Sequence, residues 1–512
     1  MPDNLASAKI FCQGGLSTSR DVLSQGENSP GSAISLVNYE PAVTGGYRKI
    51  SGYTNAYGTV PGTGDVLGVA VVNGVHDGIL ACRTPAAGSD YLHYWDVATS
   101  AWVTVATVGS PTMTGVAKVR FTRYNWGYPE VMLTDGVNPA AVYDGTTYTQ
   151  ITHANAPAAP KYSCVFRNHM FLAGDATEPT NLYFSAPYSE YDYGPANGAG
   201  VINVGFPIVQ VKAFRNELYI FGSNSIKKLI GENVANFVLE QVTNDLGCLA
   251  SDSVIEVGGD LLFLSQDGLR PISGTAKIGD VNLETVSKDI QSIFTDIVFD
   301  IDLEGLNAVL VRQKTQFRYF FKAADSQGII GGFRPSQNGL SFEYGQLLGI
   351  EATCADSGYL GQYEFVIHGD SAGRVHRQES GNSFNGDPIF SLYQTPYLHM
   401  EDPELRKIFY SVSTYMRSEG DNSIVMSAVY DYEDFNTLSP SNYNMSTTGA
   451  AAYYNEVLYD STAVYDGNPS PVQRTNIAGS GKAISLKYVT SSTEASHSIQ
   501  GIVITYGVGD RR

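Results

Sequence analysis

The sequence predicts an all-β protein: a β-propeller of six to eight blades, with an additional β-sandwich or platform region and an extended N-terminal arm. Three segments repeat the order strand, tight polar turn, hydrophobic strand and Gly-bearing turn, and they begin at residues 166, 214 and 257. A recurrence of about 40–50 residues built from short strands is typical of propeller blades. The 53 glycines suit tight turns, and the 33 tyrosines suit half-exposed strands.

The repeat extends over most of the chain when one hydrophobic position is taken from each unit. The steps between successive positions range from 39 to 56 residues, so the predicted number of blades stays between six and eight. These positions are Ile79, Val131, Met170, Leu218, Leu261, Phe317 and Phe365.

Composition divides the chain into three regions. Residues 1–60 are rich in Gly, Ser and Asn and are predicted to form an arm and the first strands, in contact with a partner. Residues 61–395 carry the blade-like repeats, with a short helical insertion near 287–298. Residues 396–512 alternate polar and apolar side chains in several stretches, which predicts a C-terminal β-rich platform or sandwich.

One amphipathic stretch predicts the helical insertion. Ser287 is a candidate N-cap, because its side chain can accept a hydrogen bond from the first helical turn. The apolar residues that follow recur at i, i+3, i+4 and i+7, so a helix would carry them on one face. They are Ile290, Ile293, Phe294 and Ile297.

Three polar stretches are predicted to lack regular structure. Residues 17–32 are predicted as an extended arm or loop that a partner orders. Residues 436–448 and 468–473 are predicted as loops of the C-terminal region, because turn-forming residues are frequent in them.

The charge balance restricts the kinds of partner that the chain can bind over a broad surface. It has 32 Lys and Arg against 51 Asp and Glu, a formal net charge of −19. Proteins that grip DNA broadly need clustered cations, so this class is excluded. The acidic balance favours solubility, or else a surface past which DNA slides without sticking.

The cysteines and the hydropathy pattern point to a reducing compartment and no membrane. The five cysteines are widely spaced and form no CxxC pair, which excludes a zinc ribbon and a redox dithiol and favours buried free thiols. No run approaches the roughly 18 apolar residues of a membrane span. We therefore expect no membrane insertion, signal peptide or lipid anchor.

One pentapeptide matches the nucleophile elbow of hydrolases in letters alone. Residues 369–373 read Gly-Asp-Ser-Ala-Gly and would make Ser371 the nucleophile. A strand precedes the motif, but residues 374–377 read as a second strand where a hydrolase has a helix. We therefore predict a hairpin turn, and Ser371 is the one nominal candidate for an enzyme on a propeller scaffold.

Other short motifs are likewise predicted to be turns. Residues 479–482 resemble a phosphate loop but have Asn476 and Ala483 where Gly and Ser or Thr are required. Residues 300–305 resemble the start of a calcium loop, but Val311 replaces its bidentate Glu.

Two further features are weak candidates for a site. Residues 265–268 faintly match the Asp-box turn of sialidase propellers. His368 and His376 flank a predicted turn and could face each other across a hairpin, which alone is weak evidence for a metal. We predict no catalytic, metal-binding or cofactor-binding residues and no cofactor.

Several phrases, taken in their order along the chain, are similar to those of one protein family, the tail nozzle proteins of short-tailed bacteriophages, also called tail hub, stabilisation or tail tubular B-type proteins. The resemblance covers most of the chain. The phrases are Leu36-Val37-Asn38-Tyr39, Gly45-Gly46-Tyr47-Arg48 and Gly52-Tyr53; Thr134-Asp135-Gly136 and Tyr143-Asp144-Gly145; Phe166-Arg167-Asn168 and Asn181-Leu182-Tyr183-Phe184-Ser185; Ser265-Gln266-Asp267-Gly268; and His497-Ser498-Ile499-Gln500-Gly501 through Arg511-Arg512.

The resemblance implies a structural protein of the virion tail, synthesised in the host cytoplasm. It implies a six-fold ring of propeller subunits that extends the DNA channel below the portal and the tail adaptor protein and docks tail fibres or spikes. Such a ring would help retain genomic DNA and then pass it during ejection. Double-stranded DNA would cross the lumen without specific binding, so we expect that lumen to be net negative. The resemblance supplies no catalytic residues.

Two other classes of function remain open. The first is a glycan-binding adhesin propeller on the surface of a phage or bacterium, which would show clustered exposed aromatic side chains. The second is an enzyme built on a propeller, with Ser371 as its nucleophile.

Overall fold

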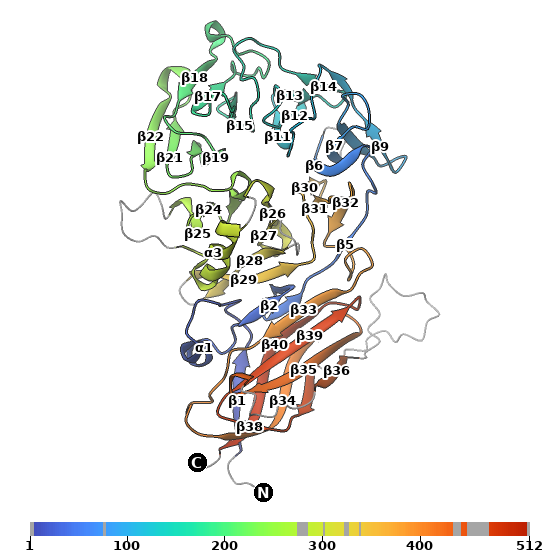
Figure 1. Ribbon diagram of the computed structural model, residues 1–512, viewed down its shortest axis with the longest axis vertical. Coiled ribbons are helices and arrows are strands. Elements are labelled where there is room, and N and C mark those ends of the chain that lie inside the picture. Colours follow the sequence, from blue (N-terminus) through green and yellow to red (C-terminus); the bar gives the residue numbers. More distant parts are fainter. Residues whose placement is uncertain are drawn as a thin grey trace.

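The computed structural model consists of a ring of small sheets joined to a two-layered sheet region (Figure 1). The ring lies at one end of the molecule, and β1 and β40 lie in the region at the other end. The structure describes residues 5–74, 78–273, 285–300, 303–321, 327–336, 339–433, 442–447 and 471–508. Within these residues, no helix is both long enough and apolar enough to cross a membrane.

Six small antiparallel sheets, which we call blades, stand in a ring, as the sequence repeat predicts. The first blade is β6 (Thr63–Val72), β7 (Gly78–Thr84), β8 (Leu92–Asp96) and β9 (Ala101–Thr104). The second is β11 (Arg120–Asn125), β12 (Pro129–Thr134), β13 (Ala141–Tyr143) and β14 (Thr147–Gln150), with β10 (Ala106–Val108) added in parallel to β14. The third is β15 (Tyr162–Phe166), β16 (His169–Ala173), β17 (Asn181–Phe184) and β18 (Gly200–Asn203).

The other three blades continue the ring in chain order. The fourth is β19 (Gln210–Phe214), β20 (Glu217–Phe221), β21 (Ile226–Ile230) and β22 (Val238–Thr243). The fifth is β23 (Ile255–Val257), β24 (Asp260–Ser265) and β25 (Gly268–Pro271). The sixth is β30 (Cys354–Leu360), β31 (Tyr363–Gly369), β32 (Val375–Gln378) and, from far earlier in the sequence, β5 (Tyr53–Thr54).

A nine-stranded sheet connects the ring to the rest of the molecule. Its first four strands, which we call the joining blade, lie between the fifth and sixth blades and close the circle. They are β26 (Asn307–Val311), β27 (Gln316–Phe320), β28 (Gln327–Ser336) and β29 (Gly339–Leu348). The sheet continues through β2 (Ser35–Val37), β33 (Ile389–Gln394), β39 (Ile484–Ser492), β35 (Asn422–Tyr430) and β36 (Tyr443–Thr447).

The seven hydrophobic positions predicted to be equivalent each lie in the second strand of a blade or of the joining blade. Ile79 lies on β7, Leu218 on β20 and Phe365 on β31, for example, and the other four lie on β12, β16, β24 and β27. The prediction of a six- to eight-bladed propeller is therefore confirmed, together with the repeat that indicated it.

Buried apolar side chains fill each interface between neighbouring blades. The first and sixth blades share one such cluster, in which Val69 and Ile367 are buried. The joining blade packs on the sixth blade through another, which contains Val309 and Val366. Because each cluster needs side chains from two blades, no blade can bury its faces alone, and the ring is stabilised as a whole.

The remaining strands form a β-sandwich, which we call the platform. Its second layer is a seven-stranded sheet that faces the far half of the nine-stranded sheet. Buried Met416 and Ile504 of this layer belong to the same core as Met426 and Leu486 of the other. The strands of the layer are β1 (Leu5–Phe11), β3 (Tyr39–Pro41), β4 (Tyr47–Lys49), β34 (Lys407–Ser418), β37 (Val472–Asn476), β38 (Ser480–Gly481) and β40 (His497–Val508).

The N-terminal residues pack along both parts of the molecule. β1 pairs with β40 over its whole length, and β5 completes the sixth blade. Within the stretch predicted as an arm or loop, the structure has helix α1 (Val22–Asn28), which the sequence analysis did not predict. Asp21 caps α1 by accepting a hydrogen bond from the backbone N–H of Ser24 at 2.8 Å.

The predicted helical insertion is present, but Ser287 does not cap it. A 3-10 turn, η4 (Lys288–Ile290), leads into α3 (Gln291–Asp300), with Ile290 and Phe294 buried against the core. The Ser287 hydroxyl instead accepts a hydrogen bond from the backbone N–H of Leu269 at 3.0 Å. That bond ties the helix entrance to the fifth blade, so the side chain is unavailable to the helix.

Two stretches predicted as loops form strands instead. β36 lies within 436–448 and β37 overlaps 468–473, and each pairs with an edge of a platform sheet. The rest of 436–448 and of 468–473 lies outside the described residues, except Asn442 and Pro471.

The other short helices are η1 (Pro195–Asn197), η2 (Val234–Asn236), η3 (Ser251–Ser253), η5 (Leu303–Gly305), η6 (Arg312–Lys314) and η7 (Asp431–Glu433).

Asn38 joins the propeller to the platform at the middle of the nine-stranded sheet. Its side-chain amide donates to the carbonyls of Leu348 on β29, at 2.9 Å, and Phe390 on β33, at 2.8 Å. Its side-chain oxygen accepts from the Leu348 N–H at 2.9 Å. Asn38 has a φ of 52°, a left-handed conformation that Asn tolerates better than most residues.

A buried ion network lies at the same junction. The Glu40 carboxylate, on β3, accepts from Lys314 at 2.6 Å, Arg48 at 3.0 Å and Arg318 at 3.4 Å. Glu379, which follows the sixth blade, also pairs with Lys314 and Arg318. Arg318 is fully buried, and among the described residues its charge is compensated by these two carboxylates, while the Gln378 side chain accepts a hydrogen bond from it.

We predict that Arg318→Met lowers the free energy of unfolding by about 3–5 kcal/mol, because it removes a buried cation that pairs with both Glu40 and Glu379. Thermal and urea unfolding of the two proteins would measure the difference. Arg20→Met is the matched control, because the Arg20–Asp289 pair is exposed and such pairs contribute about 0–1 kcal/mol. Equal effects of the two substitutions would contradict the prediction.

Candidate functional site

The structure places Ser371 in the hairpin turn between β31 and β32, where it is exposed. The turn is closed by hydrogen bonds from the Asp370 N–H to the Arg374 carbonyl and from the Gly373 N–H to the Asp370 carbonyl. The nearby His376 pairs through Nε2 with the Asp370 carboxylate at 2.9 Å. The prediction of a hairpin turn is confirmed.

His368 and His376 do face each other across this hairpin. They are opposite in register, and their rings stack with centroids 4.9 Å apart. Gln378 donates to His368 Nδ1 at 3.1 Å, so the pair is held inside the sixth blade. Among the described residues, no group of three or more His, Cys, Asp or Glu is placed to hold a metal ion.

Of the other candidate motifs, residues 265–268 lie at a turn, as predicted, whereas residues 479–482 include a strand that pairs with β34. Residues 265–268 form the turn between β24 and β25, where Asp267 pairs with Arg270. Residues 479–482 contain the short strand β38, and the Lys482 N–H donates to Asp431 at 2.7 Å. In the predicted acidic turn at 300–305, residues 301–302 lie outside the described residues. All five cysteines are buried and free, which confirms that prediction.

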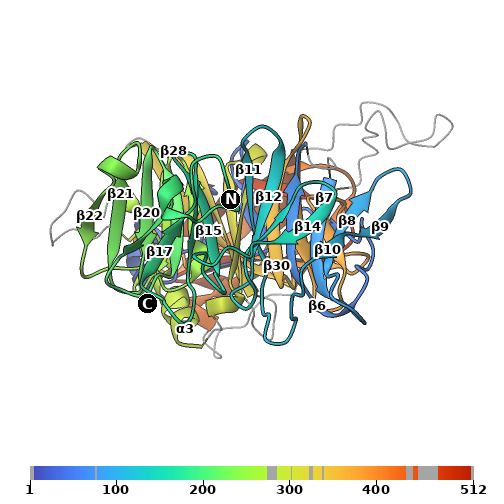
Figure 2. The same ribbon diagram turned by 90° about the horizontal axis from the view of Figure 1, so that it is seen from above.

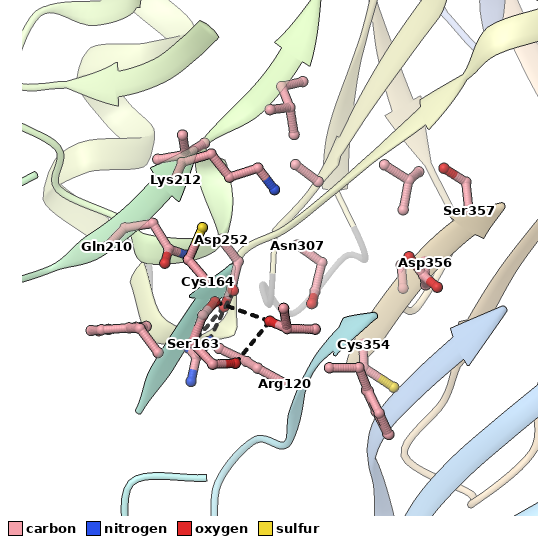
Figure 3. A pocket seen from close by; sticks show the side chains of 18 of the residues that line it. Arg120, Ser163, Cys164, Gln210, Lys212, Asp252, Asn307, Cys354, Asp356 and Ser357 are labelled. Atoms are coloured by element: carbon pink, nitrogen blue, oxygen red, sulfur yellow. Dashed lines mark hydrogen bonds and ion pairs between the residues drawn. The ribbon is translucent and has the colours of Figure 1, made fainter. Parts of the chain in front are cut away.

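The clearest concave feature is a cavity of about 490 Å³ on the axis of the ring. Its walls come from the first strands of the blades, which surround the axis in Figure 1 and are seen from the edge of the ring in Figure 2. Figure 3 shows Gln210 and Lys212 on one side of the cavity and Cys354 and Asp356 on the other.

An ion cluster closes one end of the cavity. Asp252 accepts from Arg120 Nε at 2.9 Å and Nη2 at 2.8 Å, and from Lys118 Nζ at 2.8 Å. Lys118 Nζ also donates to the Leu306 carbonyl at 2.9 Å, and the Arg120 guanidinium lies 5.2 Å from the centre of the Tyr162 ring. The cluster connects the second and fifth blades to the joining blade across the axis.

Burial and charge act in opposite directions on these groups. Burial alone would raise the pKa of Asp252, but Arg120 and Lys118 outweigh it and hold the pKa well below its usual range. Burial lowers the pKa of Lys118 in spite of the adjacent carboxylate. The cluster is therefore structural, because Asp252 pairs with both cations.

Three hairpin turns surround a second cavity, of about 540 Å³, at the other end of the axis, which we call the mouth. Arg167-Asn168, Arg215-Asn216 and Gly258-Gly259 occupy the same position in the third, fourth and fifth blades. All six residues have φ between 48° and 78°, as a type I′ turn requires. The repeated Phe-Arg-Asn phrase in the sequence is thus the inner turn of a blade.

Sequence analysis did not identify either end of the cavity as a site. Lys118, Arg120 and Asp252 are up to 134 positions apart and match no motif. The repeated Arg-Asn pair is the sequence feature that could have indicated a binding surface at the mouth, but it also fits the turn of a blade.

Several solved structures are weakly similar to this chain. Hsv2 of Kluyveromyces lactis, with a loop replaced by a linker, has a TM-score of 0.33 and 8% identity, over 55% of this chain and 83% of that one. Exo-β-1,3-galactanase of Phanerochaete chrysosporium with galactose has a TM-score of 0.24 and 9% identity, over 89% and 100%. The extracellular domain of BT4673 from B. thetaiotaomicron has a TM-score of 0.37 and 10% identity, over 66% and 40%.

The architecture itself defines the class: this chain is a β-propeller protein with a β-sandwich platform. No protein-family model matches the sequence, and no curated protein does so. At TM-scores below 0.5, the likenesses to solved structures carry no argument about function.

The buried histidines make stability depend on pH. Burial lowers the pKa of His368 to about 3, with His376 as a further cause, and burial also lowers the pKa of His497 to about 3. The unfolded chain binds these protons near pH 6.5, so the stabilisation is complete above that pH and is lost as the pH falls towards 3.

We predict that the free energy of unfolding falls from pH 7 to pH 5, with a slope of about 1.4 kcal/mol per pH unit for each of these histidines once the pH is below 6. His497→Gln should reduce the slope while leaving an acceptor for the Tyr39 hydroxyl, which lies 2.7 Å from His497 Nε2. His153→Gln, at a partly exposed side chain, is the control and should leave the slope unchanged. Urea unfolding at each pH would measure it.

Proposed function

We propose that the chain is a structural subunit of a bacteriophage tail, a nozzle or hub ring that extends the DNA channel below the adaptor. In this role it helps retain genomic DNA and then passes it during ejection. The sequence resemblance supports the proposal, and so does the architecture. The observation that carries it is an exposed apolar face on the platform, at the end of the molecule away from the propeller.

This platform face is the outer side of the seven-stranded sheet. Gly501 of β40 is paired with Phe11 of β1 on one side and with Tyr415 of β34 on the other. The side chains of Phe11 and Tyr415 are 70% and 43% exposed. Glycine adds no side chain between them, so the row stays flat. The exposed apolar residues of the platform face are Leu5, Phe11, Ile408, Tyr410 and Tyr415, and exposed Ser7 and Lys9 lie between the first two on β1.

A ring subunit needs such a face. Closed rings form when one surface of each subunit binds a different surface of its neighbour, or when all subunits bind a common partner ring. Contiguous exposed apolar side chains on a soluble protein mark surfaces of this kind. The propeller would supply the rigid wall, because its strands are paired around the ring and leave only short edges.

The charge balance supports passage of DNA without binding. A formal charge of −19 per subunit gives an assembled ring a strongly negative field, which repels phosphates. A lumen with a continuous Lys and Arg lining in an assembled ring would overturn this part of the proposal.

An adhesin that binds glycans is the second candidate. The cavity of about 540 Å³ at the mouth favours it, since that volume suits a small ligand. Binding of the purified protein to a glycan array, without ring formation on the adaptor, would favour the adhesin over the nozzle. No role is proposed for Ser371, and equal esterase readings for wild type and Ser371→Ala would agree with that.

We predict six-fold rings of the purified protein, either alone or only after addition of the adaptor. Native mass spectrometry and negative-stain images would measure the assembly. The Phe11→Ser, Tyr415→Ser double variant should shift the assembly to monomers, because it removes the two exposed aromatic side chains on either side of Gly501 in the platform face.

The control for this prediction removes two exposed aromatic side chains from the propeller instead. Tyr359→Ser, Tyr363→Ser should still form rings, because both residues lie on the sixth blade, away from the platform face. Monomers of the wild type in the presence of the adaptor would contradict the proposed function.

A further inference from the structure

Cations gather along the axis of the propeller, although the chain as a whole is acidic. The axial cavity and the mouth share Ala213 and Glu256 in their walls and are therefore adjacent. Their combined lining has seven cationic and three anionic side chains, the reverse of the balance in the chain. The cations are Lys118, Arg120, Arg123, Arg167, Lys212, Arg215 and Arg312, and the anions are Asp252, Glu256 and Asp356.

Four of these cations form ion pairs within the protein. Asp252 pairs with Lys118 and Arg120 at the sealed end. Arg123 pairs with Asp356, and Arg312 lies 3.5 Å from Glu364, outside the lining. These side chains are parts of the wall and are not available to a ligand.

Of the other three cations, Arg167 and Arg215 line the mouth, and Lys212 lines the axial cavity beside it. Among the described residues, Arg167, Lys212 and Arg215 form no ion pair, and the Arg167 Nε atom is buried without a hydrogen-bond partner. Arg215 donates one hydrogen bond, to the Gly259 carbonyl of the next turn. Lys212 is exposed and points into the axial cavity in Figure 3.

The turns themselves do not explain the two arginines. Arg167 and Arg215 each have a φ of 48°, a conformation that costs a side-chain-bearing residue about 1 kcal/mol or more. Gly258 holds the same position in the third turn, with a φ of 62° and no such cost. Each arginine also lies over the phenylalanine before it, at 5.6 Å and 4.9 Å, which keeps its guanidinium at the mouth.

We propose that Arg167, Lys212 and Arg215 bind a compact polyvalent anion at the mouth of the propeller axis. The two guanidinium groups would bind phosphate or carboxylate oxygens in pairs, and the Lys212 ammonium would add a third charge from inside the cavity. Glu256, in the wall of both cavities, opposes the anion and limits its affinity. This site is independent of the proposed tail function.

The mouth is an open recess between three neighbouring turns, which suits a compact ligand. Its volume, about 540 Å³, lies within the range of small-ligand pockets. Duplex DNA would instead need cations spread along a track of phosphates, and the surroundings of the mouth belong to an acidic chain. The ligand that fits this site is a small molecule with several phosphate or carboxylate groups, either a free polyanion or an acidic oligosaccharide.

Isothermal titration calorimetry of the full chain would test the proposal with two probes, tripolyphosphate and trigalacturonate. We expect saturable binding of at least one probe at one site per chain, weakened by added salt. Tighter binding of tripolyphosphate assigns the site to phosphates, and tighter binding of trigalacturonate assigns it to acidic sugars.

Three variants test the residues. The double variant Arg167→Gly, Arg215→Gly should weaken binding about a hundredfold, and Lys212→Gln should weaken it about tenfold. Each charged hydrogen-bond donor that is removed is expected to cost about a factor of ten in affinity. Glu256→Gln should tighten binding, because it removes the opposing charge. Lys482→Gln is the control, since that exposed lysine lies on the platform and should not matter.

The double glycine variant also separates binding from folding. Glycine occupies the equivalent position in the third turn, so the thermal midpoint of this variant should be no lower than that of wild type. The absence of saturable binding of both probes would overturn the proposal, as would equal weakening by Lys482→Gln. Tighter binding of a 20-base-pair duplex than of either probe, lost in the double variant, would overturn the compact ligand.

Discussion

The buried ion network around Glu40 and Glu379 is the constraint on which the rest of the structure depends. Arg318 and Lys314 of the joining blade reach carboxylates from the N-terminal strands and from the end of the sixth blade. The network therefore fixes the last part of the ring and the first part of the platform to each other. With Asn38 bridging β29 and β33 nearby, the two parts share one continuous sheet and cannot hinge freely at that point.

The platform face and the mouth, the two surfaces proposed to bind partners, lie on different parts of this rigid body. The platform face is apolar and flat, as an assembly contact requires, whereas the mouth is concave and cationic. The sealed end of the axis, with Asp252 at its centre, separates the mouth from the opposite side of the propeller. Assembly and ligand binding can therefore change independently, since no residue belongs to both surfaces.

The fold could be predicted because each blade repeats a local pattern. Leu218 and Phe365 occupy equivalent strands although they are 147 positions apart, and hydrophobic spacing alone aligned them. Helix α1 was missed because its seven residues are too few and too polar to show a helical pattern. Asp21 caps the helix, but a helix this short is stable through tertiary contacts, which no local pattern shows. The cations of the axis were missed for a similar reason: the blades bring them together only when the ring closes.

The pairing of β1 with β40 has a consequence for the order in which the molecule forms. About 490 residues separate the two strands, and at ribosomal rates of roughly 5–20 residues per second the first waits about 25–100 s for the second. Blades can form in succession during that time, because their strands are neighbours in the sequence. The platform is completed last. A chain whose synthesis stops early therefore has a propeller but an incomplete platform, and it cannot join an assembly through the platform face.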